Sequence, residues 1–437
     1  MDPFSEDPAA PRRWLALVAV LAAGVLVHAL WFTEPHAVVF DEVYFGRYAL
    51  DYLGHRNVFD NHPPLGKLIF AAMAGLLGLD PGFGFSPNGA PFPDARYALI
   101  RVPAHLAGAA FPAVLFALAR QLGLSRWAAF VVGLLAALDN AILVMSRTAQ
   151  MDLFLMVFGF GALACWLRHR NGGGAGWFAA AAVLAALAPC IKWTGLSFTA
   201  LVVLLEALRG WRQRDWRSAG RIAAVLAATA LLYVAFFAVH FALVEGRVPP
   251  DLLDRTLALN AQMWASTKGT TPQHAYGSKW YDWPFMMRTV DFWARYQDPL
   301  MFRIYLLGNP VVWWATGYAM LYLLVNFLPK LPALVARERP APAAPVELLL
   351  IGAYLMNMLP FTQIRRVTFL YHYLPSLGFA LLALGLLLDR SGRHARWLGW
   401  TLLALAAAAF VYWAPLSYGL PLTREQFDAR FWVPTWK

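Results

Sequence analysis

Residues 14–32 read WLALVAVLAAGVLVHALWF, and residues 40–47 a few positions later read FDEVYFGR. The first stretch is apolar over about 20 residues, which is the length that a helix needs to cross a bilayer. The second stretch places two adjacent carboxylates, Asp41 and Glu42, just beyond that helix. Charge beside a bilayer costs free energy and usually marks a functional site. These residues therefore predict a membrane fold with chemistry at its surface.

The rest of the chain has the composition of an integral membrane protein. Hydrophobic residues make up 60% of the 437 residues and charged residues 14%, whereas a soluble domain carries about 25% charged residues. The formal net charge is +11, but the basic residues lie in short connections between apolar runs. That distribution is typical of membrane topology signals, so nucleic-acid binding is not expected.

Apolar segments recur along the whole chain, and we expect an all-α polytopic fold in a single domain, residues 1–437. Eleven spans are predicted: 14–32, 97–119, 127–145, 150–168, 176–191, 194–208, 221–243, 306–328, 346–362, 367–389 and 396–414. Connections rich in Lys and Arg alternate with connections that lack them, and the basic ones should face the cytoplasm. The N-terminal tail, residues 1–13, is then cytoplasmic and the C-terminus lies on the outer face.

This topology places most of the polar residues in the outer loops. The segments expected on the outer face are the two long loops 33–96 and 244–305 and the tail 415–437. Apolar periodicity predicts helices over 41–54 and 65–77, both lying on the membrane surface. Segment 81–94 is rich in Pro and Gly and should be an irregular loop. No internal repeat is visible, which argues against a transporter built from inverted repeats.

Asp41 and Glu42 are the first candidates for catalysis. Adjacent residues on a helix point about 100° apart, so they cannot both face one substrate atom. One carboxylate fits a general base that deprotonates an attacking alcohol, while the other binds a neighbouring group. The alternative, which the spacing alone favours, is that both cap the helix over 41–54. His62 precedes two prolines that fix its direction, but its spacing from Asp41 and Glu42 matches no metal site.

Several cations lie at the outer ends of predicted spans or in outer loops, where the topology predicts few of them. Arg101, at the outer edge of the second predicted span, fits a phosphate ligand, and snorkelling to the interface is an equal alternative. Arg365 and Arg366 lie on the outer side, where the topology predicts few cations, and indicate an anionic lipid head group. Lys279 is a further phosphate candidate. Trp280 beside it suits a sugar face, although aromatic belts at the interface give the same pattern.

Charged groups at the outer ends of the third and fourth predicted spans leave two readings open. Arg147 and Asp152 follow Asp139 closely in sequence, and these residues either bind a ligand or pair with one another. Lys192, in the short connection after the fifth span, raises the same question. The chain lacks a Gly-rich phosphate loop and the common hydrolase motifs, so nucleotide-driven chemistry is not expected. A sugar or group donor should therefore be a membrane lipid.

Taken in order, these motifs resemble the protein O-mannosyltransferase family, whose members have the GT-C glycosyltransferase fold. The matching segments are 41–46 (DEVYFG), 62–67 (HPPLGK), 101–103 (RVP), 139–152, 192–195 (KWTG), 274–280 (HAYGSKW), 307–314 (LGNPVVWW) and 369–375 (FLYHYLP). They extend over nearly the whole chain beyond the N-terminal tail. Eukaryotic members usually carry a soluble MIR domain in the second long outer loop. Here that loop, 244–305, is too short for one, as in the bacterial members of family GT39.

The resemblance implies transfer of mannose from a polyprenyl-phosphate carrier to Ser or Thr hydroxyls of exported proteins, with inversion at the sugar carbon. It implies that Asp41 is the general base, that Glu42 orients the acceptor or the sugar, and that Arg101 binds the carrier phosphate. Lys279, Arg365 and Arg366 are additional phosphate candidates. The candidates for sugar or acceptor binding, all within the matching motifs, are His62, Asp152, Lys192, Trp280 and His372. No obligatory metal or other cofactor is implied, and the expected location is a bacterial inner membrane.

Two competing functions stay open at this point. One is a GT-C transferase that moves another lipid-linked sugar to a glycolipid such as lipid A. The other is a lipid-linked sugar transporter without catalysis. Transporters place their sites near the bilayer midplane, whereas the carboxylates and aromatic residues here lie in outer loops. This placement argues against a transporter. The order of the motifs favours the mannosyltransferase over a transferase with a glycolipid acceptor.

Overall fold

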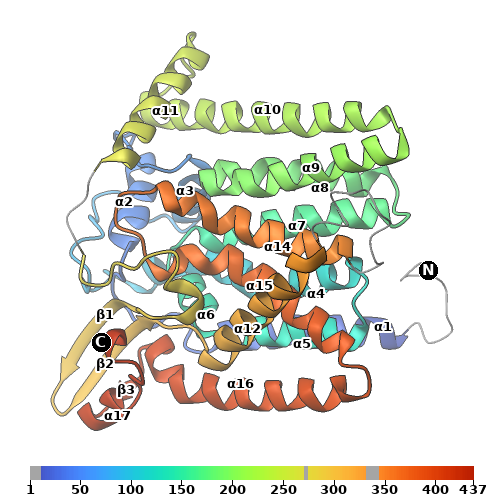
Figure 1. Ribbon diagram of the computed structural model, residues 1–437. Helices are drawn as coiled ribbons and strands as arrows, with labels where there is room; N and C mark the ends of the chain where they lie inside the picture. The colour runs from blue at the N-terminus through green and yellow to red at the C-terminus, as the bar shows by residue number, and fades with distance from the viewer. Residues whose placement is uncertain (1–10, 270–273, 331–343) are drawn as a thin grey trace.

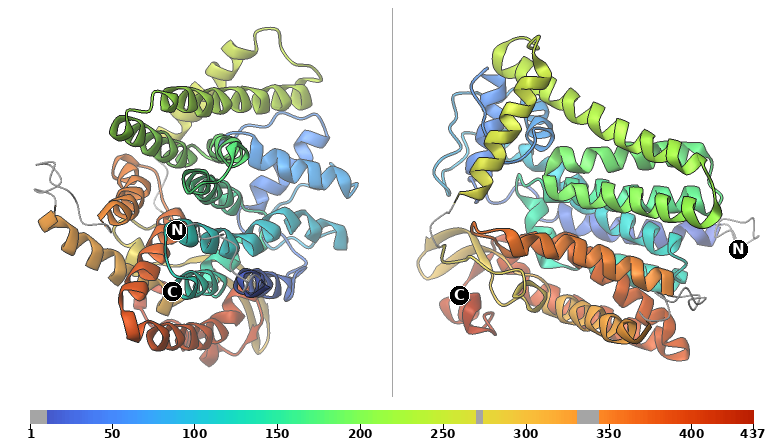
Figure 2. Two further views of the ribbon diagram at one scale, coloured as in Figure 1. Left: turned by 90° about the vertical axis from the view of Figure 1, so that its right-hand side faces the viewer. Right: turned by 45° about the horizontal axis from the view of Figure 1, so that its top comes forward.

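The structure, a computed structural model, describes residues 11–269, 274–330 and 344–437. Most of these residues form a bundle of roughly parallel helices with a smaller layer at one end (Figure 1). The bundle helices are α1 (Pro11–Ala29), α4 (Val102–Gln121), α5 (Arg126–Ala137), α6 (Asn140–Arg147), α7 (Asp152–Arg170), α8 (Ala175–Ile191), α9 (Leu196–Gln213), α10 (Arg217–Glu245), α12 (Pro310–Phe327), α14 (Ala344–Met358), α15 (Leu374–Arg390) and α16 (Ala395–Tyr418). Seen along the bundle, α8–α10 lie on one side, α12–α16 on the other, and α4 and α5 between them (Figure 2).

All eleven predicted spans fall on helices of this bundle. Eight described helices are long and apolar enough to cross a membrane, or nine if α5 and α6, bent by 54° at their junction, form one span. Helices α1 and α8 are shorter apolar helices, and whether they cross stays a prediction. The multi-pass architecture is confirmed. Helix α1 begins at the end of the bundle opposite the C-terminus (Figure 1), as an odd number of spans requires.

The bend between α5 and α6 has an identifiable cause in Asp139. One oxygen of this carboxylate accepts the Ile142 N–H (3.0 Å), which caps α6. The other accepts the Asn309 N–H (3.0 Å) and the indole N–H of Trp313 (2.8 Å) at the start of α12. Because the side chain satisfies backbone donors that a broken helix leaves free, the chain turns here and ties the third span to the eighth.

The layer at one end of the bundle, which we call the outer layer after the loops predicted to form it, contains the remaining helices and a small sheet. The helices are α2 (Glu42–Leu53), α3 (Leu65–Leu76), α11 (Leu252–Lys268) and the short α17 (Arg424–Asp428). Helices α2 and α3 match the predicted ranges closely. They pack on each other and bury one face each, with Leu50 and Phe70 inaccessible to solvent. They are therefore part of the protein's outer layer and not helices that rest on lipid alone.

A three-stranded antiparallel sheet completes the layer, which the all-α prediction omits. The strands are β1 (Val290–Gln297), β2 (Leu300–Leu306) and β3 (Pro421–Leu422), in the order β1-β2-β3. The hairpin β1–β2 carries a bulge between Asp291 and Trp293. The third strand is hard to foresee because it has only two residues and lies far from the hairpin in the sequence.

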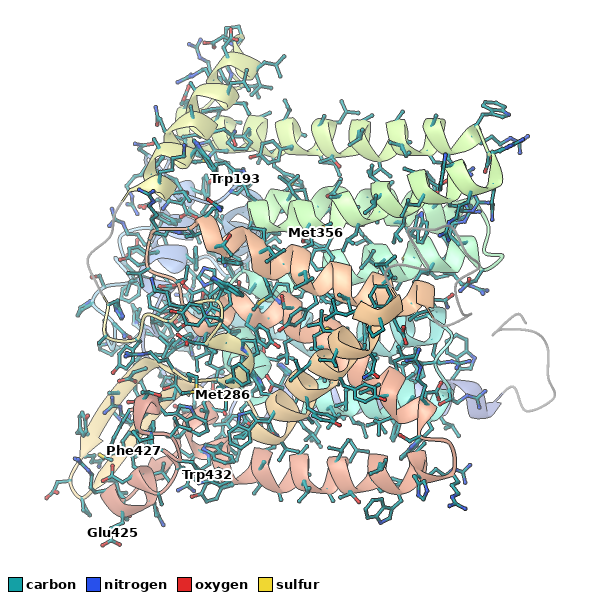
Figure 3. The ribbon with its side chains drawn as sticks, viewed as in Figure 1. Trp193, Met286, Met356, Glu425, Phe427 and Trp432 are labelled. Atoms are coloured by element: carbon teal, nitrogen blue, oxygen red, sulfur yellow. The ribbon has the colours of Figure 1, made fainter. Side chains whose placement is uncertain are left out.

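The C-terminal tail folds back over the outer loops. Trp436 is fully buried, and its indole N–H donates to the Met286 carbonyl (2.5 Å). Trp432 packs edge-on against Trp413 of α16, with ring centroids 4.4 Å apart. Figure 3 shows Met286, Phe427 and Trp432 gathered at this end of α16. The predicted outer tail is thus an integral part of the layer that holds the candidate site.

Candidate active site

Charged and aromatic side chains from five separate segments meet at the outer end of the bundle. The group, which we call the charged cluster, consists of Asp41, Asp60, His62, Asp152, Lys192, Arg366, Tyr371 and His372, which interact electrostatically with one another. They come from the start of α2, the loop before α3, the start of α7, the end of α8 and the segment before α15. The structure therefore brings together Asp41, His62, Asp152, Lys192, Arg366 and His372 from the sequence predictions.

Lys192 and Asp152 form the central ion pair of this cluster. The Lys192 ammonium lies 2.8 Å and 2.9 Å from the two oxygens of Asp152, and each side chain is 12% exposed. The same ammonium lies 5.7 Å from the centre of the Tyr371 ring, within the range of a cation–π contact. Asp152 begins α7 and Lys192 follows the last residue of α8, so the pair joins the outer ends of two neighbouring helices.

Asp41 occupies the N-cap position of α2, but its side chain makes no capping hydrogen bond. None of the described residues donates a hydrogen bond to the Asp41 carboxylate. Burial raises the pKa of Asp41 to about 7; Lys192 opposes this shift, while Asp152 and Asp60 add to it. The capping hypothesis is therefore wrong for the Asp41 side chain. A carboxylate with free oxygens and a pKa near neutrality is suited to accept a proton.

The loop around His62 is fixed by a buried lysine. The Lys67 ammonium donates to Asp60 (2.8 Å) and to the His62 carbonyl (2.5 Å), and both charged side chains are largely buried. Burial lowers the pKa of the His62 imidazole to about 3, although Asp60 partly opposes this. His62 is therefore neutral at physiological pH and able to donate or accept a hydrogen bond.

An aromatic stack holds His372 on the far side of the cluster. Its ring lies parallel to those of Tyr371 (centroids 4.6 Å apart) and Trp283 (5.8 Å). The Ser278 N–H donates to the Thr368 carbonyl (2.8 Å), and the Thr368 hydroxyl donates to the Ser278 carbonyl (2.6 Å). These contacts dock the second outer loop on the segment before α15.

Arg366 is half-buried beside this stack and has an unsatisfied donor. Its Nε is buried and lacks a hydrogen-bond partner among the described residues. Arg366 interacts electrostatically with His62, Tyr371 and His372. A buried guanidinium N–H without a partner costs free energy, and an anionic ligand in the cluster would satisfy it.

Glu42 faces away from the cluster and forms a buried ion pair with Arg101. Both side chains are fully buried, and the guanidinium grips the two carboxylate oxygens at 2.7 Å and 2.8 Å. Glu42 also accepts the N–H groups of Val39 (2.8 Å) and Ala149 (2.9 Å). Arg101 donates further to the carbonyls of Pro35 (2.9 Å) and Ala37 (2.7 Å). Every nitrogen of Arg101 is thus engaged, and no oxygen of Glu42 is free.

The turn that presents Asp41 is also held from outside. Phe40 has a φ of +50°, a conformation that costs a bulky residue free energy. Its N–H donates to the Asn88 side chain (3.1 Å), which in turn donates to the Phe292 carbonyl of β1 (2.9 Å). The rings of Phe40 and Phe292 stack at 4.0 Å. Asn88, which the sequence did not single out, therefore bridges both outer loops at the residue before Asp41.

Two family models cover this arrangement from end to end. The model described as "Dolichyl-phosphate-mannose-protein mannosyltransferase" matches residues 16–245, and the "C-terminal four TMM region of protein-O-mannosyltransferase" matches residues 252–436. The chain belongs to the protein O-mannosyltransferase family. The charged cluster of this family member draws on both matched regions, since Arg366 and His372 lie in the second.

Named relatives are similar over part of their length. Protein O-mannosyltransferase 1 of Drosophila pseudoobscura pseudoobscura is 32% identical over 235 residues, which are 50% of this chain and 26% of that protein. Dolichyl-phosphate-mannose–protein mannosyltransferase 1 of Saccharomyces cerevisiae is 30% identical over 203 residues, 43% of this chain and 24% of that protein. The chain thus spans about a quarter of the length of these relatives.

Solved structures show the same fold. The S. cerevisiae Pmt1-Pmt2 complex bound to the sugar donor has a TM-score of 0.86 at 18% identity, covering 97% of this chain and 93% of that chain. The Archaeoglobus fulgidus oligosaccharyltransferase, in complex with Zn and sulfate, has a TM-score of 0.53 at 13% identity, covering 95% of this chain and 55% of that chain. The GT-C fold is confirmed by these matches.

Three of the predicted ligands of the mannosyltransferase family lie apart from the cluster. Lys279 and Arg365 are exposed. Among the described residues, the side chains of these two cations make no hydrogen bond or ion pair to the charged cluster. Trp280 is half-buried and packs edge-on against Tyr281, with centroids 5.7 Å apart. These three stay predictions without a contact to support them.

The charged residues around Asp139 do not pair with one another as one reading suggested. Asp139 binds the start of α12, and Asp152 binds Lys192. Arg147 donates to the carbonyls of Leu30 (2.7 Å), Trp31 (2.5 Å) and Glu34 (3.0 Å). It therefore fixes the chain where α1 ends. Asp139 caps the start of α6 and Arg147 is its last residue, so the length of the helix separates these two side chains.

The structure offers no metal site among the residues that it describes, since no three His, Cys, Asp or Glu side chains lie close enough to hold an ion. Independence from metals and other cofactors stays a prediction. Asp60, Lys67 and Tyr371 were not assigned a role from the sequence. Asp60 lies two residues before the HPPLGK motif and Lys67 ends it, so the available signal was a pair of opposite charges on either side of two prolines.

Replacing Glu42 by Gln should destabilise the protein, because it leaves Arg101 buried without a counter-charge. Breaking one partner of a buried ion pair costs about 3–5 kcal/mol, which chemical or thermal unfolding of the purified protein in detergent would measure. Glu245→Gln is the matched control, since Glu245 pairs with Arg255 at the surface and such pairs contribute about 1 kcal/mol or less. A Glu42→Gln variant that is fully stable but inactive would instead support direct contact with substrate.

Proposed function

We propose that the protein transfers mannose from a polyprenyl-phosphate carrier to Ser or Thr hydroxyls of exported proteins, with inversion at the sugar carbon. The observation that carries this proposal is Asp41, a half-buried carboxylate that accepts no hydrogen bond from the described residues and lies in one cluster with Lys192 and Arg366. Family membership supports the class of donor and acceptor, because the relatives are named for dolichyl-phosphate-mannose and protein. We place the protein in a bacterial inner membrane with the charged cluster on its outer face.

The proposed reaction is a single displacement. Asp41 accepts the proton of the acceptor hydroxyl while that oxygen forms a bond to the anomeric carbon of mannose. The bond from this carbon to the phosphate oxygen breaks, and the carrier phosphate leaves with the electron pair. Such a step requires base, carbon and leaving group in line. Asp41 later releases its proton to solvent, and its pKa near 7 suits both halves of this cycle.

The leaving phosphate needs positive charge, not a strong acid. We propose Arg366 as its ligand, because its buried Nε has no hydrogen-bond partner among the residues that the structure describes and a guanidinium suits a phosphate. Lys192, held by Asp152, adds a second cation to the same cluster. Arg101 is a weaker candidate than the resemblance implies, because its nitrogens are all engaged. We assign Arg101 and Glu42 to holding Asp41, and His62, Asp152, Lys192 and His372 to binding sugar or acceptor.

Asp41→Asn tests the proposal directly. We expect the rate of mannose transfer to fall by about 10²–10⁴-fold, the scale of a lost general base, with binding of the lipid-linked donor retained. Radiolabelled polyprenyl-phosphate-mannose and a Ser/Thr peptide would report transfer, and filter binding would report the donor. Asp254→Asn, in exposed α11, is the matched control and should transfer at the normal rate. Full activity in Asp41→Asn would remove Asp41 as the base.

The raised pKa of Asp41 predicts how activity depends on pH. The base must be ionised, so kcat/KM should rise about tenfold per pH unit below pH 7 and level off above it. Initial rates with a subsaturating acceptor peptide between pH 5 and 9 would measure this. A midpoint near pH 4, the ordinary range of a carboxyl, or a flat profile would contradict a base with a raised pKa.

Arg366 and Arg365 form a natural pair for testing the phosphate ligand. Arg366→Gln should raise the KM for the lipid-linked donor by about tenfold or more, the scale of a lost charged hydrogen bond. Arg365→Gln should leave it unchanged, because Arg365 is exposed and lies outside the cluster. Donor titrations at saturating peptide would separate the two. Equal effects of both changes would indicate general attraction of the anionic lipid.

The remaining alternatives have less support. A non-catalytic transporter does not fit the family. Transporters place their sites near the bilayer midplane, whereas the charged cluster lies at one end of the bundle. A glycolipid acceptor such as lipid A is tested by offering purified protein both acceptors with one labelled donor. Label on lipid A alone would overturn the protein acceptor while keeping the transferase chemistry.

A further inference from the structure

A groove lies next to the turn that carries Asp41. It has a volume of about 240 Å³ and lies between the two outer loops, lined by Asn88, Gly89, Asp291, Phe292, Trp293 and Ala294. One wall is the loop 81–94 and the other is the first half of β1. The charged cluster does not contribute to it, so the groove is a feature separate from the proposed catalytic residues.

The strand that forms one wall is an edge strand. Strand β1 pairs with β2 on one side only, and no strand pairs with its other edge in the part of the chain that the structure describes. Its residues Ala294–Gln297 are exposed, and the hairpin extends away from the bundle (Figure 1). An edge of this kind presents a row of unpaired N–H and C=O groups that an extended chain can join.

The groove is coupled to Asp41 through a single residue. The Asn88 side chain accepts the Phe40 N–H and donates to the Phe292 carbonyl, and the rings of Phe40 and Phe292 stack at 4.0 Å. Asn88 and Phe292 line the groove, and Phe40 directly precedes Asp41. A chain paired with the free edge of β1 and entering the groove would therefore reach Phe292, which Asn88 links to the residue before Asp41.

We infer that this groove and the free edge of β1 dock the acceptor polypeptide as an added strand. The occupant is an extended, unfolded segment that contains Ser or Thr. Backbone hydrogen bonds to β1 would hold it independently of its side chains, and the next residues would carry a hydroxyl past Phe40 to Asp41. The inference rests on the proposed function, because it deepens the acceptor side of that reaction.

This mode of binding fits an enzyme that must accept many sequences. Main-chain hydrogen bonds supply affinity without reading side chains. It also requires the acceptor to be extended, so a Ser or Thr inside a folded helix would not be used. Recognition would thus depend on the folding state of the acceptor more than on a sequence motif.

The experiment measures peptide binding and sugar transfer separately in the full-length protein. A fluorescent, extended Ser/Thr peptide is titrated by anisotropy without donor, and then offered with labelled polyprenyl-phosphate-mannose. Ala294→Trp fills the groove, and we expect the peptide Kd to rise about tenfold or more, the scale of losing two or more hydrogen bonds. The matched control is Glu425→Trp, an exposed residue of α17 beside the opposite edge of the sheet (Figure 3), where the Kd should stay within about twofold.

Backbone methylation of the peptide tests the added strand itself. Two peptides carry N-methyl groups on alternate residues, the first on the odd positions and the second on the even positions. The backbone N–H groups of a strand point alternately to its two edges, so only one of the two methylated sets faces β1. We expect one methylated peptide to lose binding and the other to keep it. Equal binding by both, or an unchanged Kd in Ala294→Trp, would overturn the docking site. Normal docking without mannose transfer would instead overturn the proposed function, so the two failures are distinguishable.

Discussion

The buried ion pair between Glu42 and Arg101 is the constraint on which the outer layer depends. Two fully buried charges are tolerated only when geometry is good and the remaining polar atoms are satisfied. Here the guanidinium meets both carboxylate oxygens, and backbone groups from two segments, residues 35–39 and Ala149, complete the set. The pair thereby ties the chain before α2 to η1 (Ala95–Arg101) and to the turn before α7. Asp41, the adjacent residue, inherits a fixed direction from a contact that does not involve substrate.

Adjacent carboxylates therefore perform opposite tasks. Glu42 accepts four strong hydrogen bonds and is held as a structural anion. Asp41 accepts none within the described residues and is surrounded by Asp60, Asp152 and Lys192. The helix separates the two side chains, so one environment stabilises charge while the other leaves a proton acceptor available. This division explains how one dipeptide can serve both the stability and the proposed chemistry of the site.

Much of this architecture could be predicted from the sequence, because hydrophobic length and turn residues are local signals. The eleven apolar segments, the extents of α2 and α3 and the irregular loop 81–94 all follow from short-range patterns. The direction of Arg101 could not be predicted, since a cation beside a span fits a phosphate and a buried carboxylate equally well. Asp152 and Lys192 lie 40 residues apart in sequence, and their pairing depends on how α7 packs on α8. The third strand of the sheet could not be predicted, because β3 contributes only two residues.

The contribution of β3 and Trp436 has a consequence for biogenesis. Strand β3 completes the sheet, and Trp436 binds the Met286 carbonyl beneath it. The layer that holds the charged cluster is therefore assembled from segments near both ends of the described chain. During synthesis on the ribosome, the first outer loop would lack its packing partners until the spans up to α16 are inserted. A nascent chain should therefore complete this layer only after α16 has been inserted and β3 and Trp436 have followed it.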